Sequence, residues 1–553
     1  MKKILLATGL FIFIGIGIYG LYRASNSMSV KIMLQNSRME DRDYEPILGI
    51  IEDQNLKLPT GQNWHHLALI LNNDPEWKIK NNLLETIPKN EPVLLTIEMW
   101  DSSVLLKVTN GKYDENFRQL FSQILETDRR IYLRWNPEME VPAGVYAWES
   151  IPPLYIESFN KFAGIIKDIS PSTKMVFGPA GFPGTLESYP GSEMVDAVSL
   201  TLNSSSENHI SLYKEVDIET QLYRKLHRFR FIDHPIFILG SKDLKPEMIN
   251  SNLIENAVNR NSALDSMFSV KPTDQNEIYG DTPLMIGVYD PKENLVNEPA
   301  VSVEHIFISF HDIISGKFET DLQIILEREN DLIISVEPGM NDNEINEKIL
   351  EDIIGGKYDD VITRFYQILS KTDRKLYLRI AHEMEIPVDR YAWQNKDPLT
   401  YIRAYRYFMQ FPGSELDNIK RIWGPAGDRG SLEYWPGADV VDYISISVYG
   451  LPDKNITDPE KQESFETILR RKLWRMRFTD KPYFITEFGV MGNEEFQNKW
   501  LEDAALVLNN EPKIMGVSYF NNDDVPEAWG EIAPPEWGIS KKTFDLFIKK
   551  LNR

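Results

Sequence analysis

The stretch LYLRIAHEMEIPVDRYAW, residues 376–393, decides how the rest of the sequence is interpreted. It begins as a short apolar run, which is typical of a buried parallel strand, and it turns polar around Glu383. A second apolar run, YFITEFGV at residues 483–490, contains Glu487 near its end. Barrel enzymes hold their reactive groups at the carboxyl-terminal ends of parallel strands. The two stretches therefore predict a parallel barrel with two glutamates at its mouth.

Most of the sequence occurs twice. GKYDENFRQLFSQILETDRRIYLRW at 111–135 matches GKYDDVITRFYQILSKTDRKLYLRI at 356–380, and PEMEVPAGVYAW at 137–148 matches HEMEIPVDRYAW at 382–393. From there on the offset between the copies drifts only from 245 to 247 residues, which is the usual length of one (β/α)₈ barrel. The other matched pairs are HHLALIL (65–71) with EHIFISF (304–310), EPVLLTIEMW (91–100) with the run around LIISVEPG (332–339), GPAG (178–181) with GPAG (424–427), TLESYPGSEMVDAVSL (185–200) with SLEYWPGADVVDYISI (431–446), and HPIFIL (234–239) with KPYFIT (481–486).

The second copy contains eight apolar runs separated by amphipathic stretches. This alternation predicts βα units and a parallel sheet, and eight strands favour a closed barrel over a doubly wound sheet. No glycine-rich phosphate turn follows the first run. The predicted fold class is α/β, with two tandem (β/α)₈ TIM barrels at residues 41–270 and 283–553 and a polar linker at 271–282. The eight runs lie at 283–289, 305–310, 332–337, 376–381, 421–426, 443–449, 483–488 and 514–520.

The N-terminus carries an export signal. Residues 4–22, ILLATGLFIFIGIGIYGLY, contain no charge and are long enough to span a bilayer. Lys2 and Lys3 favour a cytoplasmic N-terminus, so we interpret residues 1–26 as an uncleaved signal anchor. A cleaved signal peptide is the alternative, because small residues at 24–27 suit a protease. In both cases the barrels lie outside the cytoplasm, either anchored to the membrane or secreted.

Composition excludes several classes of protein. A net charge of −23 argues against nucleic-acid binding. The absence of cysteine excludes disulfides, cysteine-based zinc sites and a cysteine nucleophile. The adjacent pair His65-His66 lies in a predicted strand, where neighbouring side chains face opposite ways, so we expect no metal site there. We expect no metal and no cofactor, and most of the 12 Trp and 24 Tyr are assigned to the core.

Glu383 and Glu487 are the pair of residues that suggests a catalytic site. Retaining glycosidases cleave glycosidic bonds with two carboxyl groups about 5–5.5 Å apart. On the fourth and seventh strands of one barrel, the two glutamates face each other across the mouth. The alternative is a structural ion pair, for instance with Arg379.

The second copy resembles glycoside hydrolase family 26, whose members include β-mannanases and some β-1,3-1,4-glucanases and β-xylanases. Three motifs carry the resemblance, which covers nearly all of 283–545: His382-Glu383-Met384 with Tyr391 and Trp393 soon after, WPGADVVDYISISVY ending at Tyr449, and ITEFG at 485–489. The resemblance implies that Glu383 is the acid/base and Glu487 the nucleophile.

The same resemblance suggests supporting residues. His382 is expected in the cleft beside the acid/base, and Tyr449 is expected to hold the nucleophile by a hydrogen bond. Arg379 lies four residues before Glu383 and shares its strand face, so it can stabilise a carboxylate. Trp393 is either a stacking platform for a sugar ring or a core residue.

Three features depart from the family pattern and leave the substrate open. Glu385 stands where the family often has asparagine after the HEM motif, GPAGDR follows the fifth strand, and the eighth strand ends in YFNND. Asp442 is assigned a structural role at the start of the sixth strand.

The first copy has lost part of this set. It keeps Glu138 at the acid/base position, but Pro137 aligns with His382, and Gly240 aligns with Glu487. Asn203 takes the place of Tyr449. A retaining mechanism without its nucleophile forms no covalent intermediate, so we predict that the first barrel is not a hydrolase. It is expected to be a carbohydrate-binding pseudoenzyme that retains Tyr146 and Trp148, or a spacer.

The sequence thus predicts a retaining endo-β-glycanase acting on a polysaccharide, with β-mannan the first candidate substrate and β-glucan the second. The alternative is a non-hydrolytic, polysaccharide-binding accessory protein in exopolysaccharide synthesis or export, working with other polysaccharide-processing proteins. The intact Glu383, Glu487 and Tyr449 favour the enzyme.

Overall fold

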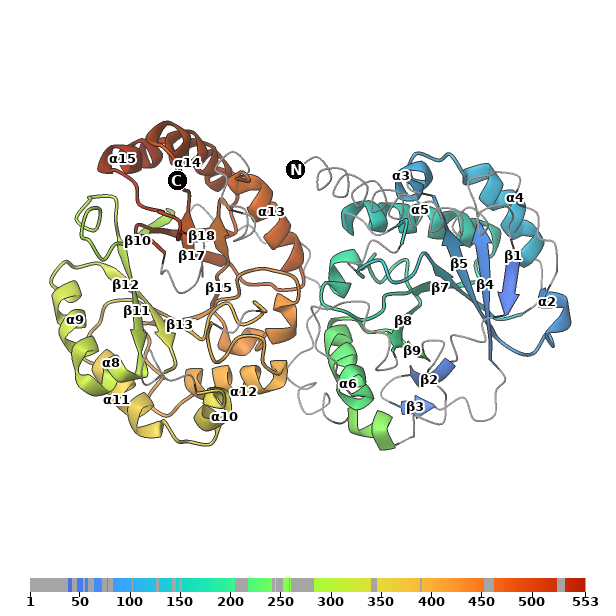
Figure 1. Cartoon of the computed structure of the whole chain (residues 1–553), viewed down its shortest axis with the longest axis horizontal. Helices are drawn as coiled ribbons and strands as arrows, with labels where there is room; N and C mark the ends of the chain where they lie inside the picture. Colours follow the sequence, from blue (N-terminus) through green and yellow to red (C-terminus); the bar gives the residue numbers. More distant parts are fainter. Residues whose placement is uncertain are drawn as a thin grey trace, which may run out of the picture. The chain divides into compact units, whose positions relative to one another are not determined.

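The chain divides into two compact units, Met1–Asp265 and Ser266–Arg553 (Figure 1). The predicted membrane or signal segment, residues 1–26, and the predicted linker, residues 271–282, lie outside the residues that the structure describes. Within the described part of the chain, no helix is long and apolar enough to cross a membrane. The computed structural model describes residues 38–41, 47–52, 55–57, 64–71, 77, 83–101, 103–125, 129–141, 146–148, 152–203, 217–240, 244, 252–257, 259, 283–339, 346–387, 390–451, 462–524 and 533–552.

The second unit is a closed parallel barrel, as the sequence predicts. β10 pairs with both β11 and β18, and β15 pairs with both β14 and β17, so the sheet has no free edge. β15 and β16 are two pieces of the sixth strand. The strands are β10 (Met285–Tyr289), β11 (Val303–Ser309), β12 (Asp331–Glu337), β13 (Leu376–Ile380), β14 (Ile419–Trp423), β15 (Tyr443–Ile444), β16 (Ser447–Tyr449), β17 (Tyr483–Gly489) and β18 (Ile514–Phe520).

Helices surround this barrel in the order that a (β/α)₈ fold requires (Figure 1). Several begin at side chains that cap the first turn: Asp397 accepts a hydrogen bond from the Thr400 amide, and Ser464 accepts one from the Thr467 amide. The helices are α8 (Phe310–Ser315), α9 (Lys317–Leu326), α10 (Ile349–Ile354), α11 (Asp359–Leu369), α12 (Pro398–Met409), α13 (Phe465–Arg475), α14 (Glu494–Asn509) and α15 (Lys541–Lys550).

Apolar side chains from five of the strands pack together inside the barrel. They are Val303, Ile333, Tyr377, Ile422 and Phe484. Side chains two residues apart on a strand face the same way. Ser335 and Arg379 therefore follow this apolar layer toward the carboxyl-terminal ends of β12 and β13, and both are buried. The barrel interior thus changes from apolar to polar as the strands approach the mouth.

The first unit differs from the closed barrel that the sequence predicts for residues 41–270. Its described strands form an open, curled sheet in the order β1-β4-β5-β6-β7-β8-β9-β2-β3. β4 to β9 are parallel, but β1 is antiparallel to β4, and β2 is antiparallel to β9. The strands are β1 (Arg38–Asp41), β2 (Ile47–Glu52), β3 (Asn55–Lys57), β4 (His65–Leu71), β5 (Val93–Met99), β6 (Ile131–Trp135), β7 (Lys174–Phe177), β8 (Ala197–Leu202) and β9 (Ile236–Gly240).

The physical reason lies at the edge of β9. In the second unit the corresponding edge pairs with the eighth strand, β18. In the first unit β2 occupies that edge, and an antiparallel partner satisfies the backbone groups of β9 without continuing the parallel order. The described helices of this unit include α2 (Leu83–Thr86), α3 (Val104–Thr109), α4 (Asp114–Leu125), α5 (Pro152–Ile169) and α6 (Ile218–Arg228), and residues 252–257 are also helical.

Candidate active site

Glu383 stands just beyond the end of β13, where the backbone leaves its extended conformation. Ala381 and Glu383 both have left-handed backbone conformations, with φ of 48° and 53°. Such conformations are strained for residues other than glycine, and they cluster at functional sites. The amide of Glu383 donates a hydrogen bond of 2.8 Å to the carbonyl of Gly424, at the end of β14. The glutamate is therefore fixed between the fourth and fifth strands.

Glu487 lies in the buried seventh strand, β17. The register of β17 against β18 shifts between Ile485 and Phe488, which marks a bulge beside Glu487. A bulge changes the direction of the side chains next to it, and bulges are frequent near active sites. One oxygen of Glu487, Oε1, pairs with Nη2 of Arg379 at 2.5 Å, and Oε2 accepts a hydrogen bond of 3.0 Å from the Tyr449 hydroxyl.

The two glutamates have different electrostatic surroundings. Burial raises the pKa of Glu383 to about 7, and the negative charges of Glu487 and Glu385 add to the effect. Glu487, in contrast, is in direct contact with the guanidinium of Arg379. Acid/base catalysis uses neighbouring carboxyl groups whose surroundings differ in this way. Glu383 can thus carry a proton near neutral pH, beside a carboxyl group that contacts a cation.

Arg379 is itself held rigidly. Its Nε donates a hydrogen bond of 2.8 Å to the Ser335 hydroxyl, which also lies 2.8 Å from Nε2 of His305. A Cβ atom at Gly424 would stand 2.5 Å from Cδ of Arg379, so the arginine can lie there only because residue 424 is glycine. The repeated GPAG motif therefore has a steric function beside the site.

His382, Tyr391 and Trp393 form a stacked group beside Glu383. The rings of Tyr391 and Trp393 are parallel, with centroids 4.4 Å apart, and Nε1 of Trp393 donates a hydrogen bond of 2.8 Å to the His382 carbonyl. Trp393 is only 3% exposed, so it fits the packing alternative and is not available as a sugar-stacking platform. Burial, followed by the charge of Arg379, lowers the pKa of His382 well below its usual range, which makes it a neutral ring.

Three partly exposed aromatic residues near the mouth were missed by sequence reasoning. Tyr289, Phe307 and Phe520 lie near the ends of β10, β11 and β18, and all three are partly exposed. The centroid of Tyr289 is 5.0 Å from that of Phe307 and 4.7 Å from that of Phe520. The centroid of Phe520 is 6.1 Å from that of Tyr449, so these rings extend to the tyrosine that is hydrogen-bonded to Glu487. The signal available in the sequence was their position at the ends of predicted strands.

A further carboxylate, Glu337, was also missed. It is the last residue of β12, and its side chain is 29% exposed. It accepts a hydrogen bond from Tyr391 and lies 3.9 Å from Nε2 of His382. Burial raises its pKa.

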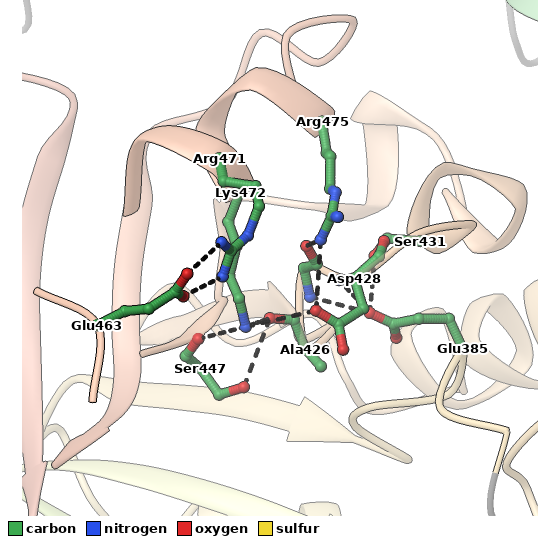
Figure 2. A network of polar contacts seen from close by, with 10 residues as sticks. Glu385, Ala426, Asp428, Ser431, Ser447, Glu463, Arg471, Lys472 and Arg475 are labelled. Carbon is green, nitrogen blue, oxygen red and sulfur yellow. Dashed lines mark hydrogen bonds and ion pairs between the residues drawn. The ribbon is translucent and has the colours of Figure 1, made fainter. Parts of the chain in front are cut away.

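A polar network joins the segments that follow β13 and β14 to the start of β16 (Figure 2). Glu385, which replaces the asparagine expected after the HEM motif, accepts hydrogen bonds at Oε1 from the amides of Gly427 and Asp428, at 2.9 and 3.0 Å. The Ser431 hydroxyl donates a third bond of 2.7 Å to the same oxygen. Glu385 thus ties the segment after β13 to the GPAG turn after β14.

Lys472, on α13, completes this network (Figure 2). Its Nζ donates hydrogen bonds of 2.7 Å to the carbonyls of both Ala426 and Ser447. The lysine therefore bridges the fifth and sixth strands, and Ser447 is in register with Glu487 on β17. Asp442 has the structural role that the sequence predicts, because its Oδ2 accepts a 2.7 Å hydrogen bond from the Arg421 amide at β14.

The same network is present in the first unit. Glu140 accepts hydrogen bonds from the amides of Gly181 and Phe182, at 2.7 and 3.1 Å. Lys225 donates to the carbonyls of Ala180 and Thr201. The internal repeat contained this signal, because these residues recur at the same offsets as the motifs.

The first unit keeps its glutamate but has lost the space for a nucleophile. Glu138 has a φ of 61°, and its carboxylate accepts hydrogen bonds from Thr201 at 2.7 Å and from Tyr146 at 2.5 Å. At Gly240, a Cβ atom would stand 3.1 Å from Leu48 and 3.4 Å from Leu244. Both leucines are buried, so apolar side chains fill the space beside the nucleophile position.

No protein-family model matches the chain. Curated relatives with partial similarity are a β-1,3-xylanase, TXYA, of Vibrio sp (24% identity over 237 residues; 36% of this chain and 47% of the relative) and a β-1,3-xylanase of Alcaligenes sp (26% over 172 residues; 30% and 33%). Endoglucanase H of Acetivibrio thermocellus is 28% identical over 201 residues, 34% of this chain and 22% of that protein. The chain therefore spans less than half the length of these relatives.

The neighbours among solved structures are mannanases and other glycoside hydrolases. The YdhT protein from Bacillus subtilis has 15% identity and a TM-score of 0.34, over 48% of this chain and 85% of that one. The catalytic domain of an endo-β-1,4-mannanase of family GH26 from Bacillus sp. JAMB-750 has 13% identity and a TM-score of 0.34, over 45% and 76%. Among the residues that the structure describes, no group of three His, Asp or Glu side chains is suited to hold a metal ion.

Proposed function

We propose that the second unit is a retaining endo-β-glycanase. The observation that carries the proposal is the asymmetry of its two glutamates: Glu487 is paired with Arg379 and Tyr449, whereas the pKa of Glu383 is raised to about 7. A retaining glycosidase needs one carboxylate nucleophile and one proton donor, and it needs no metal.

The reaction follows from these roles. An oxygen of Glu487 attacks the anomeric carbon, while Glu383 gives its proton to the glycosidic oxygen that departs. The sugar is then bound covalently to Glu487. In the second step the carboxylate of Glu383 removes a proton from water, the water oxygen bonds to the anomeric carbon, and Glu487 leaves as a carboxylate. The hydrogen bond from Tyr449 and the charge of Arg379 stabilise that carboxylate before attack and after release.

The substrate is proposed at the level of β-linked polysaccharides. The family resemblance favours β-mannan first and β-glucan second. The relatives are named as β-1,3-xylanases and an endoglucanase, which adds β-1,3-xylan to the substrates to test. The partly exposed rings of Tyr289, Phe307 and Phe520 supply the apolar surface that the faces of sugar rings stack on.

We also propose that the protein is exported, either anchored through residues 1–26 or released after their cleavage. The first unit is proposed to be non-hydrolytic, because Gly240 and the leucines around it leave no nucleophile. It would hold a glycan or act as a spacer. Retention of Glu138 and Tyr146, in hydrogen-bond contact, favours glycan binding.

The test measures release of reducing ends by the purified full chain from β-mannan, mixed-linkage β-glucan, β-1,3-xylan, β-1,4-xylan and cellulose. Wild type is expected to cleave one of them, and Glu487→Ala is expected to lose at least roughly a thousandfold in rate, about 4 kcal/mol of transition-state stabilisation. Glu502→Ala, which removes an exposed carboxylate on α14, is the control and is expected to retain full activity. Polymers that are bound but never cleaved would support the accessory-protein alternative. Cleavage that survives Glu487→Ala would mean that the nucleophile is another residue.

A further inference from the structure

The mouth of the second unit contains a carboxylate that the two-glutamate mechanism does not use. Glu337 lies two residues beyond Ser335 on β12, so it faces the same way, one layer closer to the mouth. Burial is the main cause of the raised pKa of Tyr289 and of Tyr391, and the negative charge of Glu337 adds to it. Burial likewise raises the pKa of Glu337, and the charge of Glu487 adds to that effect. The residue therefore belongs to the same cleft as the proposed nucleophile.

A structural ion pair does not explain Glu337. Among the described residues, its partner within ion-pair range is Nε2 of His382, at 3.9 Å, and burial keeps that ring neutral. The guanidinium groups of Arg390 and Arg379 lower the pKa of Glu337, but burial has the larger effect. Because the side chain is only partly exposed, holding this carboxylate without a close cation costs free energy.

The geometry leaves Glu337 able to accept more hydrogen bonds. A carboxylate has about four acceptor positions, and Tyr391 supplies one donor. The Glu337 side chain is 29% exposed, compared with 9% for Glu487. The partly exposed rings of Tyr289 and Phe307 lie on the two preceding strands. A carboxylate beside exposed rings is suited to a sugar, whose hydroxyls donate while its apolar face stacks.

The internal repeat gives independent support. Thr96 pairs with Arg134 in the first unit as Ser335 pairs with Arg379 in the second, so Glu98 is the counterpart of Glu337. Glu98 is partly exposed and accepts a 3.1 Å hydrogen bond from Nε1 of Trp100. This carboxylate is thus present in a unit that has no nucleophile at its Gly240 position. Its role is therefore separate from bond cleavage.

We propose that Glu337 is a substrate-recognition residue that accepts hydrogen bonds from hydroxyl groups of the sugar unit beside the cleaved bond. The proposal rests on the proposed glycanase function and deepens it. Tyr391 positions the carboxylate, and Glu98 is its counterpart for glycan binding in the first unit.

The first experiment compares kcat and KM of Glu337→Ala and Glu337→Gln with wild type, using the polymer that the full-length wild type cleaves. Loss of a charged acceptor is expected to raise KM at least about tenfold for Glu337→Ala, with a smaller change in kcat. Glu337→Gln keeps one acceptor oxygen, so its KM is expected to lie between those of wild type and Glu337→Ala. Tyr391→Phe removes the positioning hydroxyl and is expected to have a smaller effect in the same direction.

The second experiment measures binding without turnover. Calorimetry measures how tightly Glu487→Ala and Glu487→Ala/Glu337→Ala bind oligosaccharides of the same polymer. The double variant is expected to bind at least about tenfold more weakly than Glu487→Ala. Unchanged KM and affinity, within twofold, would overturn the role of Glu337 while leaving the glycanase intact. A fall in kcat and in unfolding temperature at constant KM would assign Glu337 a structural role instead. Absence of both cleavage and binding across the polymer panel would reject both proposals.

Discussion

Arg379 and Glu487 form an ion pair of 2.5 Å between the fourth and seventh strands of the second unit, and their side chains are only 2% and 9% exposed. The pair joins the strand that leads to Glu383 to the strand that holds the proposed nucleophile. In the first unit the equivalent arginine, Arg134, is fully buried and lies 3.9 Å from Glu138. The arginine is thus present even where the nucleophile is absent.

Arg379→Met should destabilise the second unit, because it leaves the Glu487 carboxylate buried without its cation. Breaking a buried pair by removing one partner costs roughly 3–5 kcal/mol, whereas replacing both partners by apolar residues is often neutral. The double variant Arg379→Met/Glu487→Leu is therefore expected to be more stable than Arg379→Met alone. Urea unfolding followed by tryptophan fluorescence measures both. A double variant as unstable as the sum of the two single changes would contradict the ion-pair interpretation.

The rate of cleavage should fall as the pH rises above about 7. Glu383 must carry a proton to protonate the leaving oxygen, and burial together with the charge of Glu487 raises its pKa to about 7. We expect kcat/KM to decline tenfold per pH unit beyond that point. The measurement is a pH profile of kcat/KM on the cleaved polymer. A decline that begins near pH 4.5, the ordinary value for glutamate, would show that the surroundings of Glu383 do not shift it.

The free energy of unfolding should also depend on pH through Glu383, and it should decrease as the pH rises. The pKa of Glu383 is about 7 in the folded chain and near 4.5 when unfolded, so the folded state holds more protons between these values. The free energy of unfolding therefore decreases as the pH rises through this window. Glu383→Gln lacks this titration, and its stability relative to wild type is expected to increase from pH 4 to pH 8. A constant difference across that range would contradict the prediction.

The sequence predicts the second unit well because its physical signals are local. Eight apolar runs, each bounded by turns, specify eight strands, and the strand-end positions of Glu383 and Glu487 place both at the mouth. Tyr449 contacts Glu487 as the family resemblance implies. These features depend on residue type and spacing, which a sequence contains in full.

What the sequence could not predict depends on contacts between distant segments. The bulge beside Glu487 is a matter of register between β17 and β18. The burial of Trp393 depends on the ring of Tyr391 that covers it. The open sheet of the first unit follows from β2 pairing with β9, and nothing in the periodicity of residues 47–52 indicates an antiparallel partner about 190 residues later.

Gly424→Ala should reduce the rate of cleavage indirectly, through the position of Arg379. The added Cβ would stand 2.5 Å from Cδ of Arg379, so the arginine that pairs with Glu487 must shift. We expect kcat/KM to fall at least about tenfold and stability to fall by roughly 1–3 kcal/mol. The matched control is Gly178→Ala in the first unit, where the Cβ would stand 2.6 Å from Nε of Arg134. It should cost similar stability without affecting cleavage; equal loss of activity in both variants would refute the positioning role.

Restoring the missing carboxylate should not restore hydrolysis to the first unit. In Gly240→Glu the new side chain meets Leu48 and Leu244, which are 4% and 1% exposed, so the carboxylate is buried against apolar groups. We expect stability to fall by roughly 2 kcal/mol or more. Made in a Glu487→Ala chain together with Asn203→Tyr, it should release no reducing ends.

The control for this last variant is the same substitution at Gly164, on α5, where no atom lies within 4 Å of an added Cβ. Gly164→Glu should leave stability unchanged or raise it, because glutamate favours a helix more than glycine does. The contrast separates the effect of a new charge from the effect of the filled space. If the first unit did gain cleavage, Leu48 and Leu244 would have to move aside. The loss of hydrolysis in this unit would then be due to the residues at positions 203 and 240 alone. If stability falls and no cleavage appears, the apolar packing at β9 is what keeps this unit from acting on a glycosidic bond.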